Sequence, residues 1–158
     1  MIEIAFGEQA RVFVPIFIKP LHGVTMLPID FKIDTGADFT TIAKAELRDL
    51  GYGDAWIARN TEGIGSATTA SGDHVKIGVV RIPMFNLFGY EALNWPFSIL
   101  LDENKDFRNL LGRDLLSGFN YTFNNDDDIF QIARAREFKR RFEFLDGQEI
   151  HVIHKGGT

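Results

Sequence analysis

Apolar and polar residues alternate along two stretches near the start of the chain. RVFVPIFIKP (residues 11–20) and MLPIDFKID (residues 26–34) follow this pattern and are rich in β-branched and aromatic side chains. Such alternation is typical of strands with one buried face. His22 and Gly23 stand between the two stretches and favour a turn. The sequence therefore predicts two strands joined by a turn.

Helical spacing is confined to short segments. In TIAKAELRDLGY (residues 41–52), apolar residues recur near the helical period and Gly51 marks the end of the pattern. NLLGRDLLSGF (residues 109–119) contains an apolar pair, a glycine and one short helical turn. We therefore expect one short helix and one further helical turn.

The remaining segments up to residue 133 favour strands. TEGIGSATTASGDHVKIGVVRI (residues 61–82) begins glycine-rich and polar and continues with alternating apolar residues, which predicts a hairpin with a solvent-facing tip. PFSILL (residues 96–101) has the composition of a buried strand. YTF and IFQIA flank NNDDD (residues 124–128) as the arms of a hairpin flank its turn. The predicted fold class is all-β.

The C-terminal segment allows two interpretations. RAREFKRRFEFL (residues 134–145) could form an amphipathic helix, whereas RFEFLDGQEIHVI (residues 141–153) also fits a hairpin with a three-residue loop at 146–148. In that hairpin Phe144 faces Ile150 and the other apolar pair lies on the same face. We favour the hairpin, and expect a domain over residues 1–133 with residues 134–158 as an extension packed on it.

Composition limits the class of protein. A chain of 158 residues with 45% hydrophobic residues and 15 Phe is long enough for one domain with a sizeable core. The chain has no Cys, which excludes disulfides, thiolate metal sites and a cysteine nucleophile. The N-terminus lacks the pattern of a signal peptide, and no run of about 18 apolar residues occurs. We expect a cytoplasmic protein without a membrane partner.

Charge argues against nucleic acid as a partner. The net charge is −5, whereas binding to phosphates requires clustered Lys and Arg. The one basic cluster, RAREFKRR (residues 134–141), is interrupted by Glu137 and balanced by Glu143 and Asp146. It is interpreted as a solvated face.

Other candidate sites in the sequence are weak. Consecutive carboxylates at residues 126–128 lack the spaced ligands and glycine of a calcium loop and are expected in an exposed turn. His151 and His154 would point to opposite faces of a strand, so a metal pair is not expected. Ser66 and Ser71 have no evident His and Asp relay. We expect neither a metal nor a cofactor.

The stretch IDTGADFTTI (residues 33–42) carries the strongest chemical signal. A predicted strand ends at Asp34, and a buried carboxylate there requires the hydrogen bonds that the Thr35 hydroxyl and the Gly36 backbone can supply. Taken alone, the three residues also fit an Asx-type turn that caps the following helix. However, a glycine-rich hairpin and the motif LLGRD (residues 110–114) follow later in the chain.

Together these motifs resemble the retropepsin-like aspartic proteases, which comprise the retroviral proteases and their single-domain cellular and bacterial relatives. The resemblance covers roughly residues 27–133. It implies a closed β-barrel or sandwich with one or two short helices and a glycine-rich flap over about residues 63–72. In that family the aspartate that matches Asp34 is catalytic, the hydroxyl that matches Thr35 bonds across a dimer axis, and the carbonyl that matches Gly36 meets the substrate backbone.

The resemblance also implies supporting and substrate-binding residues. Ala37 and Asp38 match positions that line the cleft, and the flap contributes substrate-binding positions at Gly63, Ile64, Gly65 and Ser66. Leu111 and Gly112 match a pair that packs behind the catalytic loop, and Arg113 matches an arginine that anchors it. From these motifs we predict an ion pair between Arg113 and Asp38 within one subunit, worth about 3 kcal/mol if it is partly buried.

The chemistry of aspartic catalysis requires a second carboxylate. One aspartate activates water as a general base while the other donates a proton to the carbonyl oxygen, and the two share one proton. FLDGQ, around Asp146, lacks the hydroxyl residue and fits a loop. We therefore predict a homodimeric aspartic endopeptidase that binds a polypeptide substrate between two copies of Asp34. The alternative is a dimerisation or peptide-binding module that keeps the fold without significant proteolysis.

Overall fold

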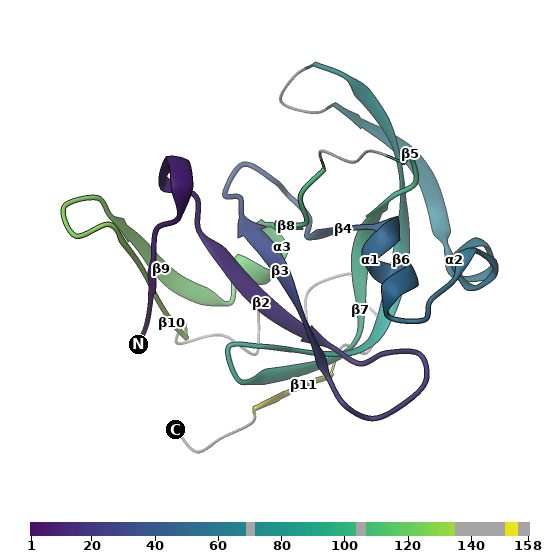
Figure 1. The fold of residues 1–158 in the computed structure, drawn as a ribbon, viewed down its shortest axis with the longest axis horizontal. Helices are drawn as coiled ribbons and strands as arrows, with labels where there is room; N and C mark the ends of the chain where they lie inside the picture. The colour runs from purple at the N-terminus through teal and green to yellow at the C-terminus, as the bar shows by residue number, and fades with distance from the viewer. Residues whose placement is uncertain (69–71, 104–106, 135–150, 155–158) are drawn as a thin grey trace.

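The protein consists mainly of β-strands (Figure 1), and the computed structural model describes residues 1–68, 72–103, 107–134 and 151–154. The strands are β1 (Ile2–Ala5), β2 (Phe13–Ile18), β3 (Leu27–Ile33), β4 (Thr41–Ala43), β5 (Glu62–Thr68), β6 (His74–Leu87), β7 (Tyr90–Leu100), β8 (Leu110–Leu111), β9 (Phe119–Asn124), β10 (Ile129–Arg134) and β11 (His151–His154). The helices are the 3₁₀ turn η1 (Glu8–Ala10), α1 (Lys44–Asp49), α2 (Asp54–Asn60) and α3 (Arg113–Leu116). The expected all-β class is confirmed.

Six strands form a closed ring of pairings. The larger sheet has the order β11-β7-β4-β8-β3-β2-β6-β5, and β7 pairs additionally with β6. This second pairing joins the two ends of the run β7-β4-β8-β3-β2-β6, so the strands close on themselves. β5 extends β6 beyond the ring as the outer arm of a long hairpin (Figure 1).

A smaller sheet with the order β1-β10-β9 lies beside the ring. β9 and β10 form the hairpin that was predicted around NNDDD, and β1 pairs antiparallel with β10. β11 pairs antiparallel with β7, with His151 opposite Leu93. The first arm and the loop of the predicted C-terminal hairpin, residues 141–148, lie outside the described residues.

The interior of the ring is built from the alternation seen in the sequence. Along β2 the exposed residues Phe13, Pro15 and Phe17 alternate with the buried Val14, Ile16 and Ile18. Phe85 and Phe97 meet edge to face inside, with ring centroids 5.1 Å apart, and Trp95 is completely buried. Burial of this apolar surface is the main stabilising contribution to the fold.

The helices differ from the sequence prediction in two respects. Residues 41–43 are not helical, because these residues form β4 and pair with β7 at Ser98 to Leu100. α2 was not predicted, and its Trp56 ring packs on Tyr52 with centroids 4.6 Å apart. The described residues therefore contain three short α-helices where one or two were expected.

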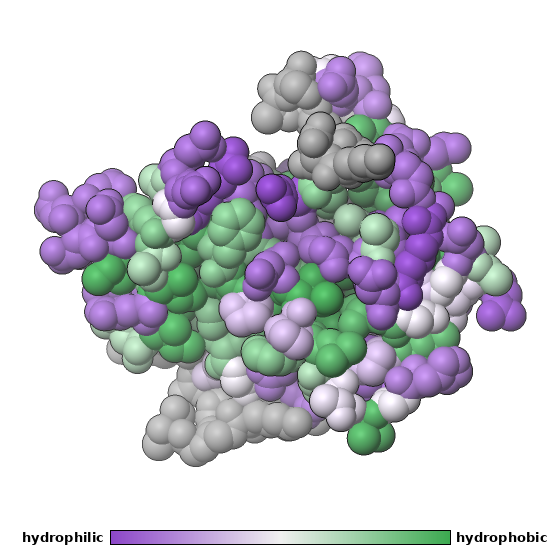
Figure 2. Space-filling model, viewed as in Figure 1, coloured by the Kyte–Doolittle hydropathy of each residue, from purple (hydrophilic) through white to green (hydrophobic). Residues whose placement is uncertain are grey.

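Hydrophilic and apolar residues cover different parts of the surface (Figure 2). The turn between β9 and β10 is hydrophilic, whereas apolar side chains reach the surface over β2 and β9. Phe13, Phe17 and Phe123 are each exposed by more than a third. Among the described residues, none of the helices has the length and apolar character that a membrane crossing would need.

Candidate active site

Asp34 begins the segment that leads from β3 to β4. β3 runs parallel to β8, with Ile33 opposite Leu111, and the Asp34 backbone N–H donates to the Leu111 carbonyl at 3.0 Å. On the other side, the Ile33 N–H donates to the Val12 carbonyl at 2.8 Å. Because β3 is held on both edges up to its last residue, the position of Asp34 is fixed by the ring.

The Asp34 carboxyl group makes a hydrogen bond through one of its two oxygens within the described residues. Its Oδ1 atom accepts the Gly36 backbone N–H at 2.9 Å, and Oδ2 makes no hydrogen bond within the part of the chain that the structure describes. This contact is the Asx-type turn considered from the sequence, but it caps no helix, because α1 begins only after Ala43. Thr35 and Gly36 are exposed beside the carboxyl group. The carboxylate is therefore oriented and accessible.

The segment after Gly36 is tied to the start of α3 by the backbone. The Arg113 N–H donates to the Ala37 carbonyl at 2.8 Å, and the Asp114 N–H donates to the Asp38 carbonyl at 3.2 Å. These bonds bring together two motifs that are distant in the sequence. The residues predicted to support the site therefore do lie directly beside the residues predicted to form it.

Gly112 allows this close approach. A Cβ atom at this position would lie 2.6 Å from the carbonyl carbon and oxygen of Phe39 and 3.0 Å from the Ala37 carbonyl oxygen. The backbone at Gly112 has φ −93°, which other residues adopt readily. Glycine is thus required here by the lack of space for a side chain and not by its conformational freedom.

The predicted ion pair between Arg113 and Asp38 is confirmed. The guanidinium Nη2 atom donates to Oδ1 of the carboxylate. The two side chains are 58% and 64% exposed, so the condition of partial burial is not met. Exposed pairs contribute about 0.2–1 kcal/mol, so the estimate of about 3 kcal/mol does not apply.

Asp114 is a residue of this region that the sequence analysis did not single out. Its Oδ1 atom accepts the Thr40 N–H at 3.0 Å, the Thr40 hydroxyl at 2.6 Å and the Leu115 N–H at 2.8 Å. The Thr40 hydroxyl oxygen in turn accepts the Gly112 N–H at 3.1 Å. Burial raises the pKa of Asp114, although the hydrogen bonds from Thr40, Leu115 and Trp95 oppose the increase.

Asn109 is a second residue that was not predicted. Its side-chain oxygen accepts the Ala43 N–H at 2.8 Å, and its amide nitrogen donates to the Asp30 carbonyl and to the Glu46 carboxylate. The residue is 5% exposed. It connects β3, β4 and α1 directly before β8. A polar residue placed before the apolar pair was the only signal in the sequence.

The residues expected to bind substrate from the flap all lie on β5. Gly63 has φ +61° at a bulge in the pairing with β6, a conformation that favours glycine. Ile64 is 68% exposed, and Gly65 and Ser66 are exposed as well. Among the described residues, no hydrogen bond or ion pair joins these positions to residues 34–38, and β5 pairs only with β6.

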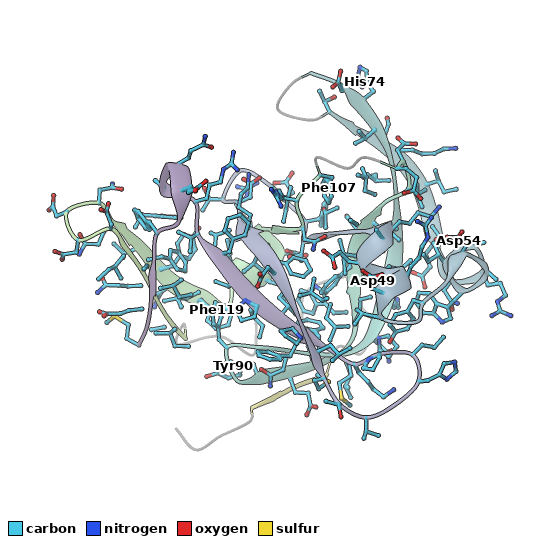
Figure 3. All side chains as sticks on the ribbon, in the orientation of Figure 1. Asp49, Asp54, His74, Tyr90, Phe107 and Phe119 are labelled. Atoms are coloured by element: carbon cyan, nitrogen blue, oxygen red, sulfur yellow. The ribbon has the colours of Figure 1, made fainter. Side chains whose placement is uncertain are left out.

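The β5–β6 hairpin nevertheless extends on the side of the ring where residues 34–40 connect β3 to β4 (Figure 1). In Figure 3, His74 marks the first residue of β6 in this hairpin. Within the described residues, no group of three or more His, Asp or Glu side chains could hold a metal ion.

Comparison with known proteins agrees with this geometry. Residues 24–118, more than half of the chain, match the family described as "gag-polyprotein putative aspartyl protease". No match was found among curated protein sequences.

Two solved structures resemble the chain. One is a retropepsin-like aspartic protease from Rickettsia conorii, with 23% identity, a TM-score of 0.62 and coverage of 84% of this chain and 97% of that chain. The other is EIAV protease in complex with the inhibitor HBY-793, with 16% identity, a TM-score of 0.46 and coverage of 72% and 92%. The chain has the retropepsin-like fold that the sequence predicted and belongs to the gag-polyprotein aspartyl protease family.

Proposed function

We propose that the protein is an aspartic endopeptidase that acts as a homodimer. Two Asp34 carboxylates, one from each subunit, share a proton and activate a water molecule for attack on the peptide carbonyl. Repulsion between the two carboxylates raises one of their pKa values, so that one acts as base and the other as acid. Thr35 and Gly36 complete the catalytic segment.

The main observation in support of this proposal is the structural environment of Asp34. Its carboxyl group follows a strand held on both edges, one oxygen is oriented by Gly36, and the other has no partner within the described residues. An oriented and accessible carboxylate is the arrangement that a general base requires. The sequence contains one Asp-Thr-Gly motif, which is why the second carboxylate is assigned to a second copy of the chain.

The substrate is proposed to be an extended polypeptide. β5 stands at the end of the larger sheet, so its outer edge can pair with the backbone of an added strand. The exposed side chain of Ile64 and the neighbouring Gly63, Gly65 and Ser66 would then contact the substrate from one side. Ala37 and Asp38 would contact it from the other. Closure of the hairpin would exclude bulk water.

Digestion of casein or a peptide library at several acidic pH values tests the proposal. We expect cleavage by the wild-type protein and a loss of at least about 10²-fold in Asp34→Asn, because an amide cannot act as a general base. Circular dichroism should show that the variant is folded. Equal rates for the two proteins would refute the catalytic role of Asp34, and absence of cleavage by both would favour a binding module.

A further inference from the structure

The carboxyl group of Asp114 holds Thr40 at both its backbone and its side chain. One oxygen accepts the Thr40 amide at 3.0 Å and the Thr40 hydroxyl at 2.6 Å. Thr40 is completely buried and ends the segment that begins at Asp34. Because a trans peptide chain is stiff, fixing the far end of so short a segment restricts where its first residues can lie.

The hydrogen bonds at Thr40 extend to Gly112. The Gly112 N–H donates to the Thr40 hydroxyl at 3.1 Å, and that hydroxyl gives its own proton to Asp114. Gly112 also lies so close to Phe39 that no side chain fits between the two motifs. Asp114, Thr40 and Gly112 therefore form one chain of hydrogen bonds across the contact that supports the site.

We propose that Asp114 is a positioning residue for the reaction at Asp34, and that its charge state controls how firmly residues 37–40 are held. This inference rests on the proposed peptidase function. Hydrogen bonds to an ionised carboxylate are stronger than those to a neutral one, so ionised Asp114 holds Thr40 more firmly. Protonation weakens these hydrogen bonds without removing the acceptor oxygen.

The surroundings of Asp114 let it titrate separately from the charged residues nearby. Burial raises its pKa, and the opposing contributions are hydrogen bonds from Thr40, Leu115 and Trp95. In α3 the neighbouring charge is Arg113, which pairs with Asp38 on the facing segment, and Asp34 begins that segment. β7 contributes the uncharged Trp95 indole.

β9 also packs against α3, and its ionisable residue is Tyr121. The Tyr121 ring packs on Phe123 and Phe130. Because activity depends on ionised Asp114 in this proposal, the pH profile of kcat should have an acid limb that belongs to Asp114. This limb is additional to the ionisations of the catalytic pair.

The first test uses Asp114→Asn, which removes the ionisation but keeps an acceptor oxygen. We expect kcat of this variant to stay near the level that the wild-type protein reaches when Asp114 is protonated, so that the limb belonging to Asp114 disappears, while KM changes less than about threefold. Asp126→Asn, in the exposed β9–β10 turn, is the matched control and should leave the profile unchanged. A uniform fall in kcat at every pH, without loss of the limb, would show a merely structural role and overturn the proposal.

The second test does not depend on Asp114→Asn folding, nor on activity. In the wild-type protein the Thr40 amide signal, followed by NMR, should titrate with a midpoint above the ordinary range for Asp, and this titration should vanish in Asp114→Asn. Thr40→Val should raise the midpoint of the Asp114 titration, which can be read at the Leu115 amide, and should lower kcat by about 10-fold to 10²-fold. Thr40→Ser keeps the hydroxyl group and should restore both the midpoint and kcat. A Thr40 amide that does not respond to pH would overturn the inference.

The two proposals fail in distinguishable ways. If no variant cleaves any peptide, the proposed peptidase function is wrong, and the effect of Asp114 on catalysis is wrong with it. The Thr40 signal would still decide whether Asp114 holds residues 37–40.

Discussion

Gly112→Ala should damage both the stability of the protein and the site, because the added methyl group meets the backbone. The new Cβ atom would lie 2.6 Å from the Phe39 carbonyl group, whereas ordinary contacts begin at 3.4 Å, so the two segments must separate by about 0.8 Å. No side-chain rotation can relieve this overlap. Overpacking of this kind typically costs about 1–3 kcal/mol of folding free energy.

The same displacement should reduce activity. Residues 37–39 directly follow the proposed catalytic segment, and the hydrogen bond from Arg113 N–H to the Ala37 carbonyl crosses the gap that must open. A misplacement near 1 Å can reduce the rate by about 10²-fold. We therefore expect a large fall in kcat alongside the loss of stability.

Gly53→Ala is the matched control. A Cβ at Gly53 would have nothing within 4 Å, and φ is −76°. Loss of a glycine at the start of α2 should cost only about 0.5 kcal/mol. Both variants should be unfolded in urea at equal protein concentration, because the proposed dimerisation would couple stability to concentration. If Gly112→Ala is as stable and as active as Gly53→Ala, the close approach at Gly112 does not position the site.

Two further predictions concern charged residues of the same region. A double-mutant cycle of Arg113→Ala and Asp38→Ala should give a coupling energy of about 0.2–1 kcal/mol, since both side chains are exposed; a coupling near 3 kcal/mol would contradict this. The pKa of Asp114 is raised on folding, so its contribution to stability is present below the ordinary pKa of Asp and is lost as the pH rises through the folded value. The free energy of unfolding of the wild-type protein, relative to Asp114→Asn, should therefore fall with rising pH in that window, and a rise would refute the assignment.

Several strands were predictable because their sequence pattern matches their environment. β2 and β3 have one buried face each, so alternation identified both of them. The β5–β6 hairpin was predicted in the same way from glycine-rich sequence followed by alternation. IDTGADFTTI and LLGRD were predicted to lie together, and backbone hydrogen bonds and the predicted pair of Arg113 and Asp38 join them.

What the sequence did not reveal depends on tertiary contacts. Residues 41–43 continue a helical pattern, yet β4 forms because these residues pair with β7. α2 has too few turns for its period to be visible, and its Trp56 is held by packing on Tyr52. The contacts of Asp114 were not predicted, because its burial and its hydrogen bonds to Thr40 involve a segment distant in the sequence.

Mixing wild-type protein with Asp34→Asn tests most directly whether one active site uses two copies of Asp34. After equilibration of equal amounts, random pairing leaves about one quarter of the dimers with two aspartates. Activity per wild-type chain should then fall to about half, and should fall further as the excess of the variant increases. Activity per wild-type chain that stays constant at every ratio, with subunit exchange verified by mass spectrometry, would contradict catalysis between two Asp34 carboxylates.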